Sequence, residues 1–298
     1  MFVSNIKKAL GLSTAALALI AAPACAQEQI DADPALWKVA DEDTTIYLFG
    51  TFHFLEGNEV WFDGAVRDAY DASSEVYIEA VPETDASVIQ AAMMEHVMLS
   101  GDQTLESLVA PEAYALFVEK AETVGLPAMA VAKMEPTMAS FTLTQMSLPG
   151  MGLTMDKGAD MTILNSANED GKTLGGLETT VEQLAALGGV SLEAQAKVFN
   201  EGMAEFDDLP EMFETMRTNW ATGNTAGFEE VFKEMNDGSP ESYQAILVDR
   251  NAKWTQTLAE RMDQPGTVFV AVGTGHLVGG DSVQSMLEAK GFTIERVQ

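Results

Sequence analysis

The chain has 298 residues, and its 46 acidic side chains far outnumber its 16 basic ones, which gives a net charge of −30. A field of this sign repels nucleic acid and anionic lipid, so the composition argues against a nucleic-acid-binding protein. With a single cysteine, Cys25, the chain has no internal disulfide, and its fold must be held together by a hydrophobic core.

The first 26 residues have the pattern of a secretory signal peptide. Lys7 and Lys8 precede the apolar stretch "ALGLSTAALALIAAPA", and Ala24-Cys25-Ala26 gives a small-x-small cleavage site. We therefore expect residues 1–26 to be removed and 27–298, about 272 residues, to be exported to the periplasm as one domain. A lipoprotein anchored through Cys25 is the alternative. No second apolar stretch is long enough to span a membrane.

Strand and helix patterns alternate near the start of the mature chain. Residues 44–54 ("TTIYLFGTFHF") predict a buried strand, "VWFDGAVRDAYDAS" a short helix, and "EVYIEAV" a second strand. This order suggests a parallel pair. Between about 85 and 240 the period changes to that of helices, which we expect at 86–99, 111–124, 156–170, 179–188, 191–203, 208–221 and 225–236.

The end of the chain returns to a sheet pattern. A long amphipathic helix, "PESYQAILVDRNAKWTQTLAERM", precedes the strand "GTVFVAVG", a helix at 280–290 and the strand "FTIERV". We therefore predict an α+β fold, in which a split, mostly parallel central sheet is built from the N- and C-terminal segments around a large helical insert, about 85–240.

The helical insert is rich in methionine, with ten of the 17 Met residues between 93 and 161. Flexible thioethers are suited to lining a groove that accepts varied apolar groups, and they also serve as ordinary core filling.

Two of the three histidines stand in the same tetrapeptide pattern behind a predicted strand. Gly50-Thr51-Phe52-His53 follows the first strand, and Gly273-Thr274-Gly275-His276 follows the strand "GTVFVAVG". Functional groups gather at the carboxyl edge of a parallel sheet, where Glu79 also ends a strand. Two imidazoles and a carboxylate form a metal site with open positions for water and substrate. The third histidine, His96, lies in a helical stretch without such a pattern and is interpreted as structural.

Together with "GKTLGGLETTVEQLAAL", "RNAKW" and "VAVGTGHLVGGDSVQSMLEAKGFTIERV", these motifs resemble the TraB/PrgY/GumN family, which includes the Tiki metalloproteases, over about 36–298. The resemblance implies an α+β fold with a split central sheet, related to the erythromycin-esterase and haem-binding ChaN-like groups. For the Tiki branch it implies divalent-metal-dependent peptide hydrolysis. Carried over by position, the metal residues are His53, His276 and Glu79. "DSVQSML" replaces a Leu-Leu pair common in the family and affects helix packing only.

Glu178, Arg250 and Asn251 also match the family pattern, and with Glu79 they are the catalytic candidates. Glu79 is either a metal ligand or the base that accepts a proton from water. Glu178 is an alternative base or complements a helix N-terminus. Arg250 or Asn251 stabilises an oxyanion, unless Arg250 forms a plain ion pair. The nitrogen and oxygen donors suit Zn, Mn and Co alike.

Two other functions compete with a peptidase. "VAVGTGHLVGG" contains the spacing G-x-G-x-x-x-G after a strand, which is typical of dinucleotide binding, but its place near the C-terminus and the predicted export argue against that. The second is a non-catalytic regulatory protein of the same fold that binds a peptide, or a haem through a histidine.

The export hypothesis predicts the first residue of the mature protein. Intact-mass analysis of protein from its native compartment should give a chain beginning at Gln27. A diacylated Cys25, or an uncut chain, would contradict cleavage after Ala26.

Overall fold

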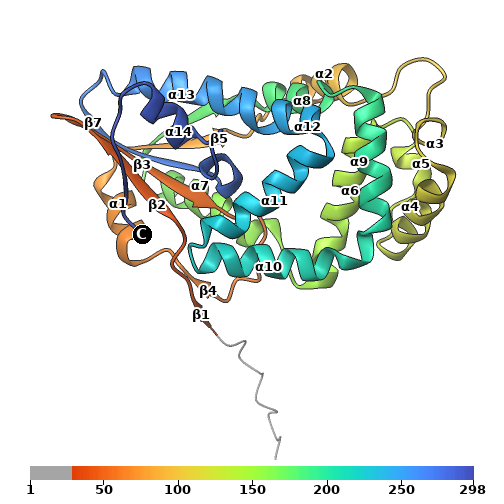
Figure 1. The fold of residues 1–298 in the computed structure, drawn as a ribbon, viewed down its shortest axis with the longest axis horizontal. Coiled ribbons are helices and arrows are strands. Elements are labelled where there is room, and N and C mark those ends of the chain that lie inside the picture. Colours follow the sequence, from red (N-terminus) through yellow and green to blue (C-terminus); the bar gives the residue numbers. More distant parts are fainter. Residues whose placement is uncertain (1–28) are drawn as a thin grey trace, which may run out of the picture.

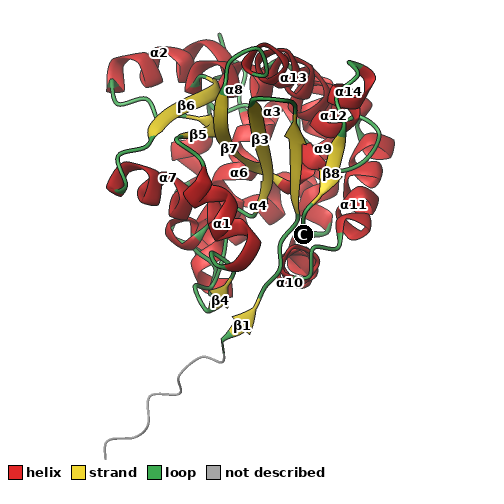
Figure 2. Ribbon diagram, turned by 90° about the vertical axis from the view of Figure 1, so that its left-hand side faces the viewer, coloured by secondary structure: helices red, strands yellow, loops and turns green. Residues whose placement is uncertain are grey.

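The computed structural model describes residues 29–298, so the predicted signal peptide (1–26) lies outside the described residues. In this part of the chain, the centre of the fold is a six-stranded sheet with the order β6-β5-β7-β3-β2-β8 (Figures 1 and 2). The four strands β6, β5, β7 and β3 are parallel neighbours, and β2 is antiparallel to β3 and β8. The bounds are β2 (Leu36–Ala40), β3 (Thr44–Thr51), β5 (Glu75–Ala80), β6 (Thr173–Glu178), β7 (Gly266–Gly273) and β8 (Ile294–Arg296). A separate parallel pair joins β1 (Ile30–Asp31) to β4 (Glu59–Val60).

Alternate residues of the central strands pack into different cores on the two faces of the sheet. Val268, Val270 and Val272 of β7 face a core shared with α13 (Asp249–Arg261) and α14 (Val283–Ala289). Phe269 and Ala271 face the opposite core, which contains residues of α1 (Gly64–Ala72), α7 (Ala159–Glu169) and α10 (Leu209–Ala221). This alternation with period two is what a strand buried on both faces requires, and it makes the sheet the middle of three layers.

The helical region lies beside the sheet and has a core of its own (Figure 1). Its buried residues come chiefly from three helices and include Phe117 and Phe199. The remaining helices are α2 (Ala86–His96), α3 (Leu105–Leu108), α4 (Pro111–Thr123), α5 (Ala128–Val131), α6 (Pro136–Ser147), α8 (Thr180–Gly188), α9 (Leu192–Ala204), α11 (Thr225–Gly238) and α12 (Pro240–Tyr243), with short 3₁₀ turns at Leu148–Met151, Met155–Lys157, Phe206–Asp208 and Thr274–Leu277.

The sheet also takes a strand from within the helical region. We did not expect β6, because "TLGGLE" contains two glycines and no run of β-branched residues. It pairs in parallel with β5 as the outermost strand on that side of the sheet. This pairing places Glu178 opposite Ala80. The α+β architecture with a mostly parallel central sheet is confirmed, with this strand added.

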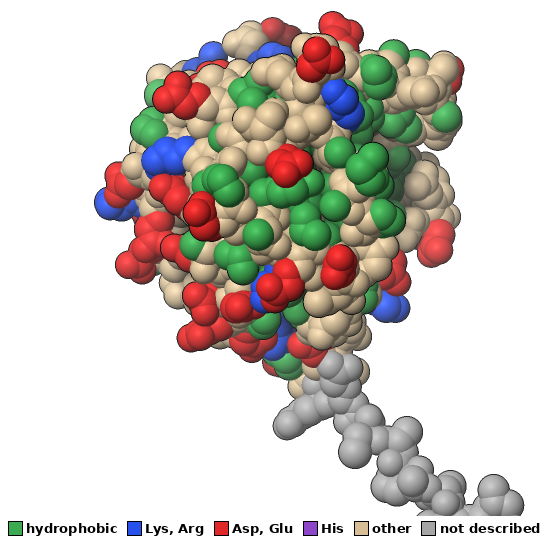
Figure 3. Space-filling model, turned by 90° about the vertical axis from the view of Figure 1, so that its right-hand side faces the viewer, with side chains coloured by type: hydrophobic (Ala, Val, Ile, Leu, Met, Phe, Trp, Pro, Cys, Tyr) green, Lys and Arg blue, Asp and Glu red, His purple; other side chains and the backbone are tan. Residues whose placement is uncertain are grey.

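The surface at the helical end shows more acidic than basic side chains (Figure 3). Acidic side chains are spread over this face, with exposed hydrophobic side chains between them (Figure 3). Among residues 29–298, no helix combines the length and apolarity needed to cross a membrane.

The separate core of the helical region predicts a strong contrast between two neighbours on α4. Phe117 is fully buried, whereas Leu116 is 37% exposed. Phe117→Ala should lower the free energy of unfolding by about 3–5 kcal/mol, because it leaves a cavity. Leu116→Ala, the matched control, should cost less than about 1 kcal/mol. Urea unfolding measures both, and equal midpoints for the two variants would contradict the burial of Phe117 in this core.

Candidate functional site

The ends of four neighbouring parallel strands bring the predicted residues to one edge of the sheet. His53 lies two residues after β3, Glu79 is the penultimate residue of β5, and Glu178 ends β6. His276 lies in the 3₁₀ turn that follows β7, and β7 is hydrogen-bonded to both β3 and β5. The carboxyl ends therefore meet as expected from the two Gly-Thr-x-His patterns.

The glycine and threonine of these patterns hold the two strand ends together. The Thr274 hydroxyl donates to the backbone carbonyl of Thr51 at 2.9 Å, which ties the second turn to the first. A Cβ on Gly50 would lie 2.8 Å from Thr274 Oγ1, so only glycine allows this approach. The repeated residues thus fix the spacing of the two histidines.

His53 is oriented by Asp160, a residue that the sequence analysis did not identify. Its Nδ1 donates to Asp160 Oδ2 at 2.7 Å, and the Thr51 hydroxyl donates to Asp160 Oδ1 at 2.5 Å. Asp160 lies in the first turn of α7. Its charge is the main cause that raises the pKa of His53 to about 9. The His53 side chain is 48% exposed, and its Nε2 remains free of the Asp160 contact.

His276 is oriented in a similar way by Asn251. Its Nδ1 donates to Asn251 Oδ1 at 2.6 Å, while Asn251 Nδ2 donates to the carbonyl of Asp281 at 2.8 Å. This chain fixes the amide and the imidazole tautomer, and it leaves the lone pair on Nε2. Burial lowers the pKa of His276 to about 3, so the ring is neutral at physiological pH.

Arg250 binds three of the strand-end residues at once. Its guanidinium donates to Glu79 Oε2 at 2.7 Å, to Glu178 Oε1 at 2.5 Å and to His276 Nε2 at 3.2 Å. The Arg250 side chain is 12% exposed and that of Glu178 is 2% exposed, so these charges are paired within the protein. Arg250 therefore forms a buried ion-pair network that occupies the centre of the edge.

A π-helical turn stands directly before Arg250. Gln244–Val248 adopts this conformation between α12 and α13, and the carbonyl of Ile246 accepts from Arg250 Nη1 at 3.1 Å. Such turns insert one extra residue into a helix and are frequent at functional sites. The turn shifts the rotational position of the following helix, and here the first turn of that helix carries Arg250 and Asn251 toward the sheet.

Glu79 is held ionised by its surroundings. Burial by itself would raise its pKa, but His276, Arg250 and His53 and the hydrogen bond from the Gly273 N–H at 2.8 Å outweigh burial and lower the pKa to about 2. Since His276 is neutral above a pH of about 3, Arg250 and His53 carry this effect at neutral pH. Glu79 is therefore a weak proton acceptor at neutral pH, and its carboxylate is charged and suited to bind a cation.

The side chains around Gly273 include donor types that divalent cations bind. A Cβ on Gly273 would lie 3.1 Å from Glu79 Oε1 and 3.3 Å from His53 Nε2, so both atoms face the space that glycine leaves. His276 Nε2 is 3.9 Å from Glu79 Oε1. Each histidine has its Nδ1 bound to an oxygen, as metal-binding imidazoles do. Among residues 29–298, however, no group of three His, Cys, Asp or Glu side chains is placed so that it could hold a metal ion. Two of the candidate donors, Glu79 and His276, instead accept hydrogen bonds from Arg250.

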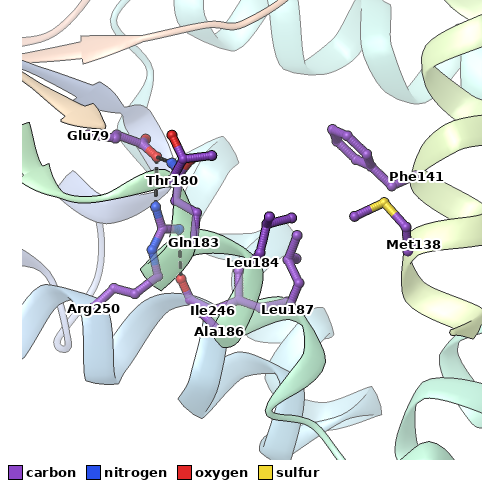
Figure 4. A pocket seen from close by; sticks show the side chains of 10 residues that line it. All are labelled: Glu79, Met138, Phe141, Thr180, Gln183, Leu184, Ala186, Leu187, Ile246 and Arg250. Carbon is purple, nitrogen blue, oxygen red and sulfur yellow. Dashed lines mark hydrogen bonds and ion pairs between the residues drawn. The ribbon is translucent and has the colours of Figure 1, made fainter. Parts of the chain in front are cut away.

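An apolar pocket of about 250 Å³ adjoins this edge. Figure 4 shows Glu79 and Arg250 together at one end, joined by a hydrogen bond, and Phe141 and Met138 opposite them. The lining residues are Glu79, Met138, Phe141, Thr180, Gln183, Leu184, Ala186, Leu187, Ile246 and Arg250. A charged edge beside an apolar hollow is the usual form of a small-molecule site.

The sequence matches the model of a known protein family. The model of the TraB/PrgY/gumN family matches residues 35–296, which is nearly the whole of the described chain. No curated protein matches the sequence.

The His53–Asp160 pair predicts a titration that one substitution removes. His53 should titrate near pH 9, and Asp160→Asn should move its pKa down toward the usual value of 6.5. Since the folded-state pKa is raised, the pair stabilises the fold below about pH 6.5, and this stabilisation is lost as the pH rises through about 9. NMR titration of the histidine ring protons measures both variants. Exposed Asp156 provides the control Asp156→Asn, which should leave the His53 pKa in place. A wild-type His53 pKa below 7 would contradict the pairing.

Proposed function

We propose that this chain, which belongs to the TraB/PrgY/gumN family, is an exported metal-dependent hydrolase that cleaves peptides. The observation that carries the proposal is the paired orientation of His53 and His276. Each ring has its Nδ1 tied to an oxygen, by Asp160 and Asn251 respectively, at the edge where Glu79 lies. Such outer oxygen partners orient each ring so that its Nε2 faces a metal. His53, whose pKa is raised to about 9, would release its Nε2 proton when a metal binds.

His53, His276 and Glu79 would hold the cation. Two imidazoles and one carboxylate leave positions open for water and substrate, and these donors suit zinc, manganese or cobalt. When bound, such an ion polarises a substrate carbonyl and lowers the pKa of water, which makes hydroxide available near neutral pH. The low pKa of Glu79, about 2, supports a ligand role for this residue rather than that of a base.

Arg250 and Glu178 act as a pair in this proposal. Glu178 receives hydrogen bonds from Arg250 Nε and Nη2 and is almost fully buried, so it positions Arg250 rather than meeting water. Arg250 Nη1 donates to His276 Nε2 at 3.2 Å. An imidazole that gives this lone pair to a cation no longer accepts from Arg250, and Nη1 becomes available for an anionic substrate oxygen.

Asn251 is assigned as a positioning residue. Both polar atoms of its side chain are engaged, by His276 and by the carbonyl of Asp281, and it is 1% exposed. Because the side chain is buried and bound at both atoms, it presents no exposed group to a substrate oxyanion. Its loss would act through the orientation of His276, by the loss of an outer hydrogen bond that typically weakens metal binding about 10–100-fold.

The proposal predicts that metal and activity are lost together. His53→Ala and His276→Ala should each abolish metal binding, measured by mass spectrometry of bound Zn, Mn and Co, and lower peptide hydrolysis by at least about 100-fold. Asn251→Leu should weaken metal binding without removing it. His96→Ala, the remaining histidine, at the end of α2, is the matched control and should keep both properties.

Two results would contradict this function. Full metal-dependent hydrolysis by either His53→Ala or His276→Ala would show that the repeated tetrapeptides are architectural. Bound peptide without turnover at any of the three metals, or a Soret band on haem addition, would instead identify the non-catalytic binding protein.

A further inference from the structure

The pocket beside Glu79 and Arg250 has a polar end and an apolar end. Thr180 and Gln183 of α8 lie with the charged pair, and Gln183 Nε2 donates to Glu79 Oε2 at 3.4 Å. The remaining wall is apolar and comes from three elements, α6, α8 and the π-helical turn, which contribute Met138, Phe141, Leu184, Ala186, Leu187 and Ile246. Figure 4 shows the two ends facing each other across the hollow.

We infer that this pocket binds an uncharged apolar side chain of the substrate, on the residue next to the bond that is hydrolysed. The inference rests on the proposed function and specifies its substrate class. Because Glu79 and Arg250 belong to both the pocket and the strand-end site, a group in the apolar end lies next to the reacting centre. The volume of about 250 Å³ is below that of pockets for whole drug-sized ligands, so it suits one large side chain.

Charged side chains are disfavoured at this position for two separate reasons. An acidic side chain would approach the Glu79 carboxylate, while the Arg250 Nη2 that faces it already pairs with Glu79 and Glu178. The remaining Arg250 donor, Nη1, is assigned to the oxygen at the reacting centre and not to this side chain. A basic group would lose its hydration against the apolar wall without gaining a free partner, because Glu79 is already paired. An apolar side chain instead gains from the removal of its surface from water.

The apolar wall of the pocket accepts apolar side chains of different shapes. Met138 is an unbranched thioether that adapts to different shapes, and Phe141 is 44% exposed and faces the hollow with only part of its ring covered. Leucine, methionine and phenylalanine are therefore expected to enter alike, and selection acts on polarity more than on shape.

Binding is tested without catalysis by NMR of the mature chain labelled on its methionine methyl groups. The probes are N-acetyl-leucinamide and N-acetyl-aspartamide carrying a free β-carboxylate. The Met138 signal, assigned with Met138→Leu, should move saturably with the leucine probe and stay in place with the aspartate probe. Met129, which is 85% exposed and does not line the pocket, serves as the internal control and should move with neither.

Cleavage is tested with a peptide library and a pair of matched variants. Most cut sites should have an apolar residue on one fixed side of the bond. Phe141→Asp should lower kcat/KM for these peptides at least tenfold and weaken the leucine-probe response. Leu116→Asp changes a comparably exposed residue of α4 outside the pocket and should leave both unchanged.

The outcomes separate this inference from the proposed function. A Met138 signal that ignores the leucine probe, or responds equally to both probes, overturns the inference whether or not peptides are cleaved. Metal-dependent cleavage without an apolar preference also overturns it and leaves the hydrolase intact. A selective Met138 response in a protein that cleaves nothing supports the apolar pocket and overturns the hydrolase.

Discussion

One buried guanidinium determines how the carboxyl edge of the sheet is assembled. Glu79 and Glu178 end neighbouring strands, and each would be a poorly compensated buried charge without Arg250. Removing one partner of such a network typically costs about 3–5 kcal/mol, because the other charge stays behind unpaired. The same arginine stacks on Trp254, whose ring lies in the core beneath α13. Arg250 therefore links the packing of that helix on the sheet to the two carboxylates at the strand ends.

The scarcity of basic residues makes their placement informative. Among the described residues, the largely buried Arg217 pairs with the buried Glu59 and with the exposed Glu214. The buried Arg261 pairs with the partly buried Glu75. Together with Arg250, these arginines neutralise acidic groups inside the fold and leave the acidic surplus to the surface. Because surface repulsion is screened by salt and buried pairs are not, added salt should reduce repulsion while the internal pairs persist.

The strands and the functional residues at their ends could be predicted from the sequence. The side chains that orient those residues in the fold could not. β3, β5 and β7 are predictable because each is a run of β-branched and aromatic residues, and their ends fix His53, Glu79 and His276. Asp160 is 107 residues from His53 and looks like any acidic residue in the first turn of a helix. The contacts of Arg250 depend on how α13 packs on the sheet, which no local pattern encodes. The orientation of the site is thus a property of the tertiary structure.

The place of β7 in the sheet has a consequence for how the chain folds. This strand lies between β5 and β3, yet it comes late in the sequence, and the hydrogen bond from Thr274 to Thr51 joins residues 223 positions apart. Until residues 266–273 are available, β3 and β5 have a gap between them instead of a shared neighbour. Such long-range pairing is slow to form, since the intervening loop must first be closed. The N-terminal strands therefore cannot complete the sheet while most of the chain is being made, and the strand-end site with His53, Glu79 and His276 is complete only after β7 has joined.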